Sequence, residues 1–254
     1  MKVLFSDIDN TLVFSHRKNN GGMNVVAEYL NGKEQSFMTQ DLYNLLLEHK
    51  QIEIIPVTTR TIEQYSRLFV FDQDFKCEYA LVCNGGILLR NGSVDEQWRN
   101  ETLRITHEQN KEVCRLLDFV KNEHSLLKLE TVDEFMFYAV FDESSIVDMY
   151  EQLSREADLN QVMVEKDARK IYVIAKNANK GTAIQRFQSE YQITNCIVVG
   201  DSNFDISMLN GSNRAIASKE LVGKIDNENT IFSQQEILAY DVGRLLSKEL
   251  GVKK

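Results

Sequence analysis

The sequence has no apolar run that approaches the about 18–20 residues needed for a membrane-spanning helix. Its N-terminal apolar segment is short and runs directly into Asp7 and Asp9, so it lacks the features of a secretory signal. Internal repeats and low-complexity segments are also absent. From these absences we expect no membrane partner and a cytoplasmic location.

Cysteine and histidine are both scarce. The four cysteines form no C-x-x-C pair, and the four histidines show no metal-ligand spacing such as H-E-x-x-H. We therefore expect reduced, buried thiols and surface histidines, with no disulfide framework and no histidine-based metal site.

Basic residues are outnumbered, with 29 Lys and Arg against 38 Asp and Glu and a net charge of −9. This charge repels a phosphate backbone, so nucleic acid is not an expected partner. A small anionic substrate stays compatible, because a bound cation can invert the local field. The 43% hydrophobic and 26% charged residues are the balance of a globular protein, and 254 residues allow two domains.

Strand-like and helical segments alternate at both ends of the chain, which predicts a doubly wound parallel sheet. Apolar runs predict strands at residues 2–6, 52–57, 79–83, 196–199, 214–217 and 230–232. Apolar stripes predict helices at residues 39–50, 61–71, 180–191, 204–209 and 234–250. The only proline, Pro56, strains the second strand because it lacks a backbone N–H. Asn31-Gly32 predicts an additional hairpin within residues 14–38.

The middle of the chain follows a different pattern. Asn91-Gly92 predicts a hairpin, and further strand-like runs alternate with helical stripes at residues 107–123 and 145–157. This combination predicts an antiparallel sheet with helices on one face. We therefore predict a Rossmann-like α/β core at residues 1–85 and 178–254, interrupted by an α+β cap domain at residues 86–177.

Paired acids follow the first predicted strand, in Asp7-Ile8-Asp9-Asn10-Thr11. Ligands of open parallel sheets bind beyond the carboxyl ends of the strands. Two crowded carboxylates repel each other unless a cation lies between them, and oxygen ligands suit Mg²⁺. A carboxylate can also attack a phosphoryl group. A solvated acidic turn is the alternative interpretation of this motif.

A second acidic motif, Gly200-Asp201 followed by Asp205, ends another apolar strand. Asp201 is therefore expected beside Asp7 around one cation, with Asp205 on the same side of the next turn. Asp205 is equally typical of an acid that favours the N-terminus of a helix.

Two weaker signals lie at the end of a strand and the start of a helix. Thr58-Thr59-Arg60 offers a hydroxyl and backbone N–H groups to a phosphate, although a plain helix cap fits as well. Lys180 precedes a predicted helix and can neutralise charge between phosphate and nucleophile. A solvated lysine is the ordinary alternative.

All four signals occur in one order that resembles the haloacid dehalogenase superfamily of phosphohydrolases. Asp7-x-Asp9-x-Thr11 resembles its first motif, Thr58 its second, Lys180 its third, and Gly200-Asp201-x-x-x-Asp205 its fourth. Four further features resemble the Cof-type subgroup (subclass IIB), which has an α+β cap of the C2 type between the second and third motifs. They are Thr-x-Arg at residues 58–60, Asn84-Gly85-Gly86, Lys180-Gly181 and Met208-Leu209.

The resemblance implies a role for each matching position. Asp7 is the implied nucleophile and a Mg²⁺ ligand, and Asp9 the general acid and base, with its backbone carbonyl on the metal. Thr58 and Lys180 would hold the phosphoryl group, and Asp201 would complete the protein ligands of Mg²⁺. The remaining assignments are Asn203 and Asp205 in support of the metal, and Thr59, Arg60, Asn84 and Gly85 in phosphate or substrate binding.

The sequence departs from the subgroup at two positions. Asn10 replaces a frequent glycine, which asparagine tolerates because it accepts left-handed conformations. Phe204 stands where asparagine is common, and we expect the neighbouring Asn203 to take over its part.

The implied function is a Mg²⁺-dependent phosphatase for a small organic phosphate, such as a sugar or polyol phosphate. A phosphomutase with the same nucleophile is the alternative, and it would require a bisphosphate activator. A non-catalytic regulatory protein on this scaffold is a remote third reading, against which Asp7, Asp9, Lys180 and Asp201 argue.

Overall fold

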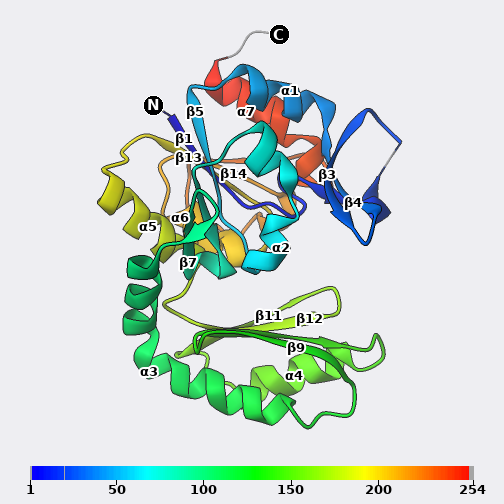
Figure 1. Cartoon of the computed structure of the whole chain (residues 1–254), viewed down its shortest axis with the longest axis vertical. Coiled ribbons are helices and arrows are strands. Elements are labelled where there is room, and N and C mark those ends of the chain that lie inside the picture. The colour runs from blue at the N-terminus through cyan, green and yellow to red at the C-terminus, as the bar shows by residue number, and fades with distance from the viewer. Residues whose placement is uncertain (1, 20, 252–254) are drawn as a thin grey trace. The chain divides into compact units, whose positions relative to one another are not determined.

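The computed structural model describes residues 2–19 and 21–251 (Figure 1). The chain divides into two compact units, one of Met1–Val94 with Lys180–Lys254 and one of Asp95–Asn179. The sequence predicts that the inserted segment starts at residue 86. In the structure the hairpin of β7 (Ile87–Arg90) and β8 (Ser93–Val94) groups with the first unit, because β7 pairs with β6 (Tyr79–Val82).

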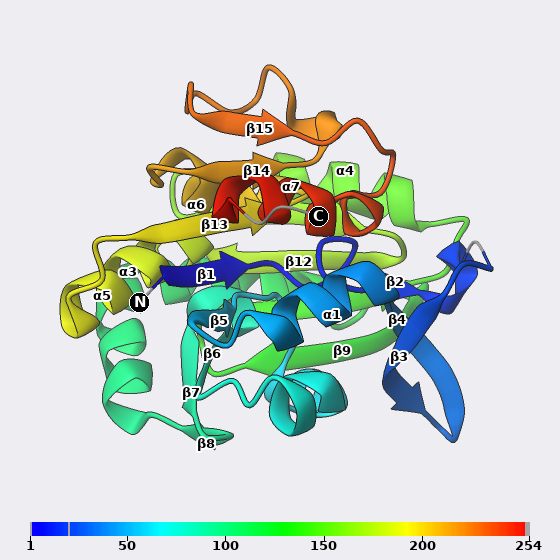
Figure 2. The ribbon, with the colours of Figure 1, turned by 90° about the horizontal axis from the view of Figure 1, so that it is seen from above.

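A parallel sheet forms the centre of the first unit (Figure 2). Its strands, in spatial order, are β15 (Thr230–Phe232), β14 (Ala215–Ala217), β13 (Cys196–Gly200), β1 (Lys2–Ser6) and β5 (Ile52–Pro56). Each neighbouring pair in this order is parallel. The helices around this sheet are α1 (Gln40–Glu48), α2 (Ile62–Ser66), α5 (Lys180–Tyr191), α6 (Ile206–Asn210) and α7 (Val242–Leu250).

Both faces of the central sheet are covered, as the continuous apolar strands predict. Leu4 belongs to a buried cluster with Leu42 of α1 and Leu245 of α7. Phe5, one residue on, points to the opposite face, where its ring packs edge-on against Phe187 of α5 at 5.8 Å. The predicted doubly wound α/β core is therefore confirmed.

Pro56 lies at a position in β5 where its missing N–H costs no hydrogen bond to β1. β5 is the last strand of the parallel sheet, and Pro56 is its last residue. Val57 donates its N–H to the Ser6 carbonyl (2.7 Å), so the alternate nitrogen, that of Pro56, faces away from β1. No hydrogen bond to β1 is lost at this edge.

β6 runs parallel to the end of β5, as predicted, but meets it through one bridge, Val57 to Leu81. It lies outside the five-stranded sheet and pairs antiparallel with β7. The turn after β6 explains the reversal, since Cys83 and Asn84 have left-handed φ angles of 53° and 59° and return the chain antiparallel to itself.

The predicted hairpin at Asn31-Gly32 joins β3 (Asn24–Leu30) to β4 (Lys33–Thr39). Both turn residues have positive φ, 52° and 75°, which suits the twist of a tight hairpin. β4 also pairs with β2 (Phe14–Ser15) to form a separate antiparallel sheet. Phe14 and Phe37 of this sheet pack on Ala239, so the sheet is anchored on the first unit.

Several helices differ in length from the prediction. Helix α2 ends at Ser66 and is followed by a π-helical turn, Val70–Asp74. The closing helix α7 starts at Val242, later than predicted. In the second unit, α3 (Glu96–Val120) begins before the predicted residue 107, because the Asp95 side chain accepts a hydrogen bond from the Trp98 N–H and caps the helix.

The second unit is an α+β layer. Its antiparallel sheet has the spatial order β11 (Val162–Asp167), β12 (Lys170–Ala175), β10 (Met136–Phe141) and β9 (Leu126–Val132). Figure 1 shows α3 and α4 (Ile146–Glu156) on one face of this sheet. The cap type implied by the sequence therefore has its expected architecture.

Two further expectations concern the whole chain. Within residues 2–19 and 21–251, no helix is both long and apolar enough to span a membrane. All four cysteines are free, but only Cys83 and Cys196 are buried, while Cys77 is half-buried and Cys114 is exposed.

Candidate active site

The carboxyl ends of three adjacent strands, β13, β1 and β5, bring the predicted motifs together. Asp7 follows β1 directly, Asp201 follows β13, and Thr58 follows Val57 at the end of β5. The Asp7 N–H donates to the Val199 carbonyl (2.9 Å), so the nucleophile candidate is still held by the sheet ladder. Thr58 is likewise held, with its N–H donating to the Leu81 carbonyl at 2.8 Å.

A tight turn follows Asp7 and returns the chain toward Asp201. The Ile8 carbonyl accepts N–H bonds from Thr11, Leu12 and Val13 at 2.9–3.2 Å. Asn10 lies in this turn with a φ of 59°, the left-handed conformation that its side chain tolerates. The buried Thr11 hydroxyl then donates to Asp201 Oδ1 (3.1 Å), which links the first and fourth motifs.

Lys180 is fully buried at the start of α5 and bridges two carboxylates. Its Nζ lies 2.6 Å from Asp7 Oδ1 and 2.6 Å from Asp205 Oδ1. Burial by itself lowers the pKa of Lys180, but the carboxylates of Asp205 and Asp7 raise the pKa above its ordinary value. The ammonium group therefore stays charged, and the solvated-lysine interpretation does not apply.

Asp205 is held by hydrogen bonds on both carboxylate oxygens. Its Oδ2 accepts from the Asp201 N–H, the Ser202 N–H and the Ser202 hydroxyl at 2.9–3.0 Å, and its Oδ1 faces Lys180. Gly200 makes this packing possible, since a Cβ there would lie 2.4 Å from the Asp205 Cβ. Asp205 thus fixes the loop that carries Asp201 and also the position of Lys180.

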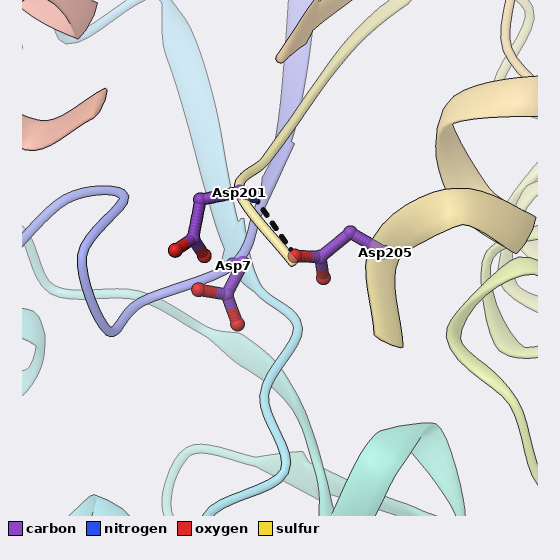
Figure 3. Close-up of side chains that lie close together, drawn as sticks. All are labelled: Asp7, Asp201 and Asp205. Carbon is purple, nitrogen blue, oxygen red and sulfur yellow. Dashed lines mark hydrogen bonds between the residues drawn. The ribbon is translucent and has the colours of Figure 1, made fainter. Parts of the chain in front are cut away.

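Negative charge accumulates where Asp7, Asp201 and Asp205 meet (Figure 3). Burial raises the pKa of Asp7 to about 7, opposed by Lys180 and reinforced by Asp205 and Asp9. Burial also raises the pKa of Asp201 well above its ordinary value, with Asp7 and Asp205 adding to the effect. Each of these shifts expresses the cost of placing carboxylates together away from water.

This cluster fits a divalent cation. One carboxylate oxygen from each of Asp7, Asp201 and Asp205 lies within 4.8 Å of the others. Hard oxygen donors are the ligands of Mg²⁺, and in the described part of the chain three carboxylates here face one ammonium group. A dication would neutralise the remaining negative charge. Because Asp205 already uses both oxygens, Asp7 and Asp201 are the better placed ligands.

The turn after β6 lies against the second motif. Asn84 donates its N–H to the Thr58 carbonyl (2.8 Å), and Cys83 donates to the Arg60 carbonyl (2.9 Å). Asn84 and Gly85 are both buried with positive φ, 59° and 88°. The Thr58 hydroxyl accepts from the Arg60 N–H (3.1 Å), which leaves its own proton for another acceptor.

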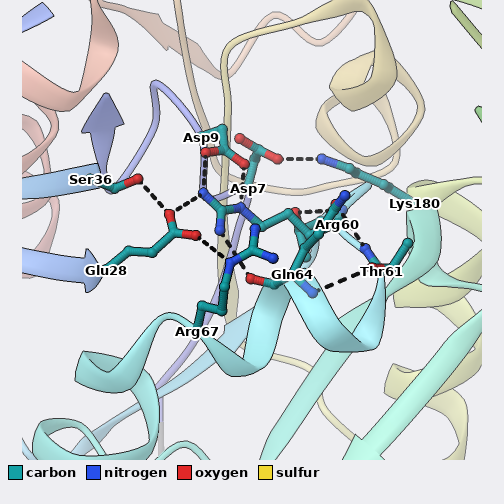
Figure 4. A network of polar contacts seen from close by, with 10 residues as sticks. Asp7, Asp9, Glu28, Ser36, Arg60, Thr61, Gln64, Arg67 and Lys180 are labelled. Carbon is teal, nitrogen blue, oxygen red and sulfur yellow. Dashed lines mark hydrogen bonds and ion pairs between the residues drawn. The ribbon is translucent and has the colours of Figure 1, made fainter. Parts of the chain in front are cut away.

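Arg60 faces carboxylates, not an open phosphate site (Figure 4). Its Nε and one terminal nitrogen bind both oxygens of Asp9 at 2.7 and 2.8 Å. The same terminal nitrogen binds Glu28 (3.0 Å), and the other binds the Gln64 carbonyl (3.1 Å). The sequence assigned Arg60 to phosphate, but this geometry commits its guanidinium group to Asp9 and Glu28.

The comparison with known families agrees with this geometry. A family model described as haloacid dehalogenase-like hydrolase matches residues 45–228, well over half of the chain. The chain belongs to this family. Thr58, Lys180 and Asp201 lie within the matched segment, whereas Asp7 precedes it.

Solved structures share the fold of this hydrolase over nearly the whole chain. The sucrose-phosphatase of Synechocystis sp. PCC6803, in complex with sucrose and phosphate, is 18% identical, with coverage of 98% and 99% of the two chains and a TM-score of 0.65. The subclass IIB sugar phosphatase BT4131 is 14% identical, with full coverage of both chains and a TM-score of 0.68. A trehalose-6-phosphate phosphatase related protein is 18% identical, with 99% coverage of each chain and a TM-score of 0.57. Among curated proteins, none matches the sequence.

Other predicted positions of this hydrolase lie outside the carboxylate cluster. Asn203 is exposed and its amide oxygen accepts from Lys224 (3.2 Å), while Phe204 is buried with 7% of its surface exposed. This bond to Lys224 does not place the Asn203 amide at the carboxylate cluster, so the expected takeover by Asn203 stays a prediction. Thr59 lies partly exposed between Thr58 and Arg60.

Glu28 is a site residue that the sequence reasoning missed. It binds Arg60, Arg67 and Ser36, and its side chain is 1% exposed. Burial by itself raises the pKa of this carboxyl, but the hydrogen bonds and charge of Arg60, with Ser36 and Arg67, lower it below the ordinary value. No sequence motif surrounds Glu28 in its hairpin, so its burial could not be predicted from the sequence.

Proposed function

We propose that this hydrolase is a Mg²⁺-dependent phosphomonoesterase that forms a phospho-aspartyl intermediate on Asp7. The observation that carries the proposal is Asp7 itself, a buried carboxylate at the end of β1 that lies 2.6 Å from Lys180 and within 4.8 Å of Asp201. Such an arrangement supplies a nucleophile, a fixed cation and ligands for a second cation, which are the parts that phosphoryl transfer needs.

In the first step an Asp7 oxygen attacks phosphorus while the bond from phosphorus to the substrate oxygen breaks. Asp9 gives its proton to the departing alkoxide, which leaves as an alcohol. In the second step Asp9 takes a proton from water, whose oxygen attacks the same phosphorus. The phosphorus–Asp7 bond breaks, inorganic phosphate leaves, and both carboxyl groups return to their initial states.

Three other residues hold the phosphoryl group or the metal in this mechanism. Lys180 Nζ makes two hydrogen bonds within the described residues, so one N–H remains for a phosphoryl oxygen. Among residues 2–19 and 21–251 the Thr58 hydroxyl accepts one bond and donates none, so its proton can go to a second phosphoryl oxygen. Asp7, Asp201 and the Asp9 carbonyl would hold Mg²⁺, which when bound supplies charge neutralisation for the phosphoryl oxygens.

A small phosphorylated metabolite is the proposed substrate, with sugar or polyol phosphates first. The support is the fold shared with proteins described as a sucrose-phosphatase and a subclass IIB sugar phosphatase. A panel of sugar and polyol phosphates assayed with Mg²⁺ for release of inorganic phosphate tests the substrate class. Phosphate release without a bisphosphate activator separates this activity from that of a mutase.

The nucleophile is tested by Asp7→Asn, with Asp41→Asn on the exposed face of α1 as the matched control. We expect Asp7→Asn to abolish turnover of 4-nitrophenyl phosphate and to prevent acid-quench trapping of a phospho-enzyme, whereas Asp41→Asn retains both. Turnover above about a tenth of the wild-type rate, equivalent to a loss of only about 1.4 kcal/mol, would exclude Asp7 as nucleophile.

A further inference from the structure

Glu28 lies at an irregularity of the β3–β4 hairpin. The strand register shifts on both sides of it, from Val26 opposite Phe37 to Glu28 opposite Ser36. A bulge of this kind breaks the alternation of faces, so Ala27 and Glu28 are consecutive and both buried. The bulge thereby turns a carboxylate inward that a regular strand would leave in solvent.

The hairpin that carries Glu28 is anchored in the first unit. Ala27 and Met38 belong to its main buried cluster, and Phe37 packs with Phe14 at a ring separation of 6.2 Å. Ser36, paired with Glu28 across the hairpin, donates its hydroxyl to Glu28 Oε2 (2.7 Å). The carboxylate is thus set by packed backbone and by a neighbouring side chain.

Glu28 in turn fixes Arg60. Oxygen Oε2 accepts from an Arg60 terminal nitrogen at 3.0 Å, and Oε1 accepts from Arg67 Nε at 2.9 Å. Only 11% of the Arg60 side chain is exposed, so its guanidinium plane is set by Glu28 and the Gln64 carbonyl on the protein side. Its two remaining contacts are with Asp9 (Figure 4).

Asp9 is the exposed end of this chain of contacts. Its side chain is 48% exposed, in contrast to Glu28 and Arg60, so packing restricts it less than it restricts those two. A paired contact from a rigid guanidinium group restricts the orientation of its carboxylate. A carboxylate oxygen has two lone pairs, so one bond from Arg60 to each oxygen does not by itself prevent proton transfer.

We propose that Glu28 is a positioning residue, which holds Arg60 so that Arg60 orients the Asp9 carboxylate for proton transfer to the leaving oxygen. The inference rests on the proposed function, because it assigns Asp9 the acid and base role. It predicts that Glu28 matters most where the leaving group needs a proton, and least where the leaving group departs as a stable anion.

The test compares two substrates in the full-length protein with Mg²⁺. Glu28→Gln keeps the shape of the side chain and removes the charge that strengthens its bond to Arg60. The measured rate is kcat/KM, which reports the steps up to departure of the leaving group and excludes the later hydrolysis step that both substrates share. We expect kcat/KM for an alkyl phosphate to fall by about tenfold or more, since misplacement of a catalytic group by about 1 Å can cost about 100-fold. The kcat/KM for 4-nitrophenyl phosphate should fall much less, because its leaving group needs little protonation.

Matched variants separate positioning from general loss of structure. Arg67→Gln removes the other cation bound to Glu28 without a contact to Asp9, and it should leave the ratio of the two rates unchanged. Ser36→Ala removes the donor to the oxygen that binds Arg60, so it should shift the ratio in the same direction as Glu28→Gln, by a smaller factor. Ser36→Ala also serves if Glu28→Gln does not fold.

A double-variant cycle decides whether Glu28 acts through Asp9. In an Asp9→Asn background, Glu28→Gln should cause no further change in the rate ratio. Equal slowing of both substrates by Glu28→Gln, or an undiminished effect in the Asp9→Asn background, would overturn the inference alone. A wild-type protein inactive toward both substrates would overturn the proposed function, and this inference with it.

Discussion

Removal of the metal should make the stability of the protein depend on pH through Asp7. The unfolded chain releases the Asp7 proton near the ordinary pKa of 3.8, whereas the folded protein retains it up to about pH 7 because the carboxyl is buried. The neutral carboxyl therefore contributes its full stability below pH 3.8, and this contribution is lost as the pH rises through about 7. The metal-free protein should be less stable near neutral pH than in mild acid.

The size of the effect follows from proton linkage. Within the window between the two pKa values, each pH unit changes the free energy of unfolding by about 1.4 kcal/mol per proton. From about pH 5 to about pH 7, Asp7 alone should lower the free energy of unfolding by about 2–3 kcal/mol. The raised pKa of Asp201 acts in the same direction.

Urea unfolding in the presence of a chelator measures this loss. Asp7→Asn is the reference, because its amide resembles the protonated carboxyl and does not titrate. Carboxylates away from the cluster titrate alike in both proteins, so the difference between wild type and Asp7→Asn reports Asp7 together with its coupling to Asp201 and Lys180. That difference should change by about 2–3 kcal/mol between about pH 5 and about pH 7, with the wild type losing the stability.

Added Mg²⁺ should reverse the loss. A cation at about 100 times its Kd stabilises the folded state by about 2.7 kcal/mol, and carboxylate ligands must be deprotonated to bind it. The stabilisation should therefore be larger near pH 7 than near pH 5. A difference between wild type and Asp7→Asn that stays flat over this range would refute the burial argument. Equal stabilisation by Mg²⁺ at both pH values would refute the carboxylate site.

Two further predictions concern packing and helix capping. Gly200→Ala should lower the free energy of unfolding by about 1–3 kcal/mol and reduce turnover, because the added Cβ displaces Asp205. In Gly211→Ala the added Cβ would lie 3.4 Å from its nearest neighbour, so unfolding and rate measurements should both change little. Asp95→Ala should destabilise the chain by about 1 kcal/mol in thermal unfolding, because Asp95 caps α3, whereas Thr39→Ala should be nearly neutral at a helix start with no side-chain cap bond.

The elements that the sequence predicts well are those whose residues are apolar on both faces. Strands β1 and β13 appear as continuous apolar runs and lie where a doubly wound sheet requires them. The start of α3 was missed for the opposite reason. Thr102 and Thr106 are fully buried, and their hydroxyls donate to the carbonyls of Trp98 and Thr102 at 3.1 and 2.9 Å. Polar residues satisfied within their own helix leave no apolar stripe to detect.

The central part of the site was predictable because strand ends define it. Asp7 and Asp201 follow adjacent parallel strands, so their meeting follows from topology once the strands are recognised. Lys180 required the additional fact that α5 starts beside them, which the order of the motifs supplied. The pKa values of Asp7 and Asp201 are both raised, and both residues suit a divalent cation, because they lie together at this edge of the sheet.

The surroundings of Asp9 were not predictable in this way, because they depend on a change of register by one residue. In a regular strand the residue after a buried Ala27 points to solvent, and a glutamate there is an ordinary surface residue. The bulge between Val26 and Tyr29 reverses that expectation and places Glu28 beside Arg60. In the structure Arg60 is thereby bound to two carboxylates of its own chain. One of these contacts comes from a hairpin distant in sequence, and no spacing around residues 58–60 records it.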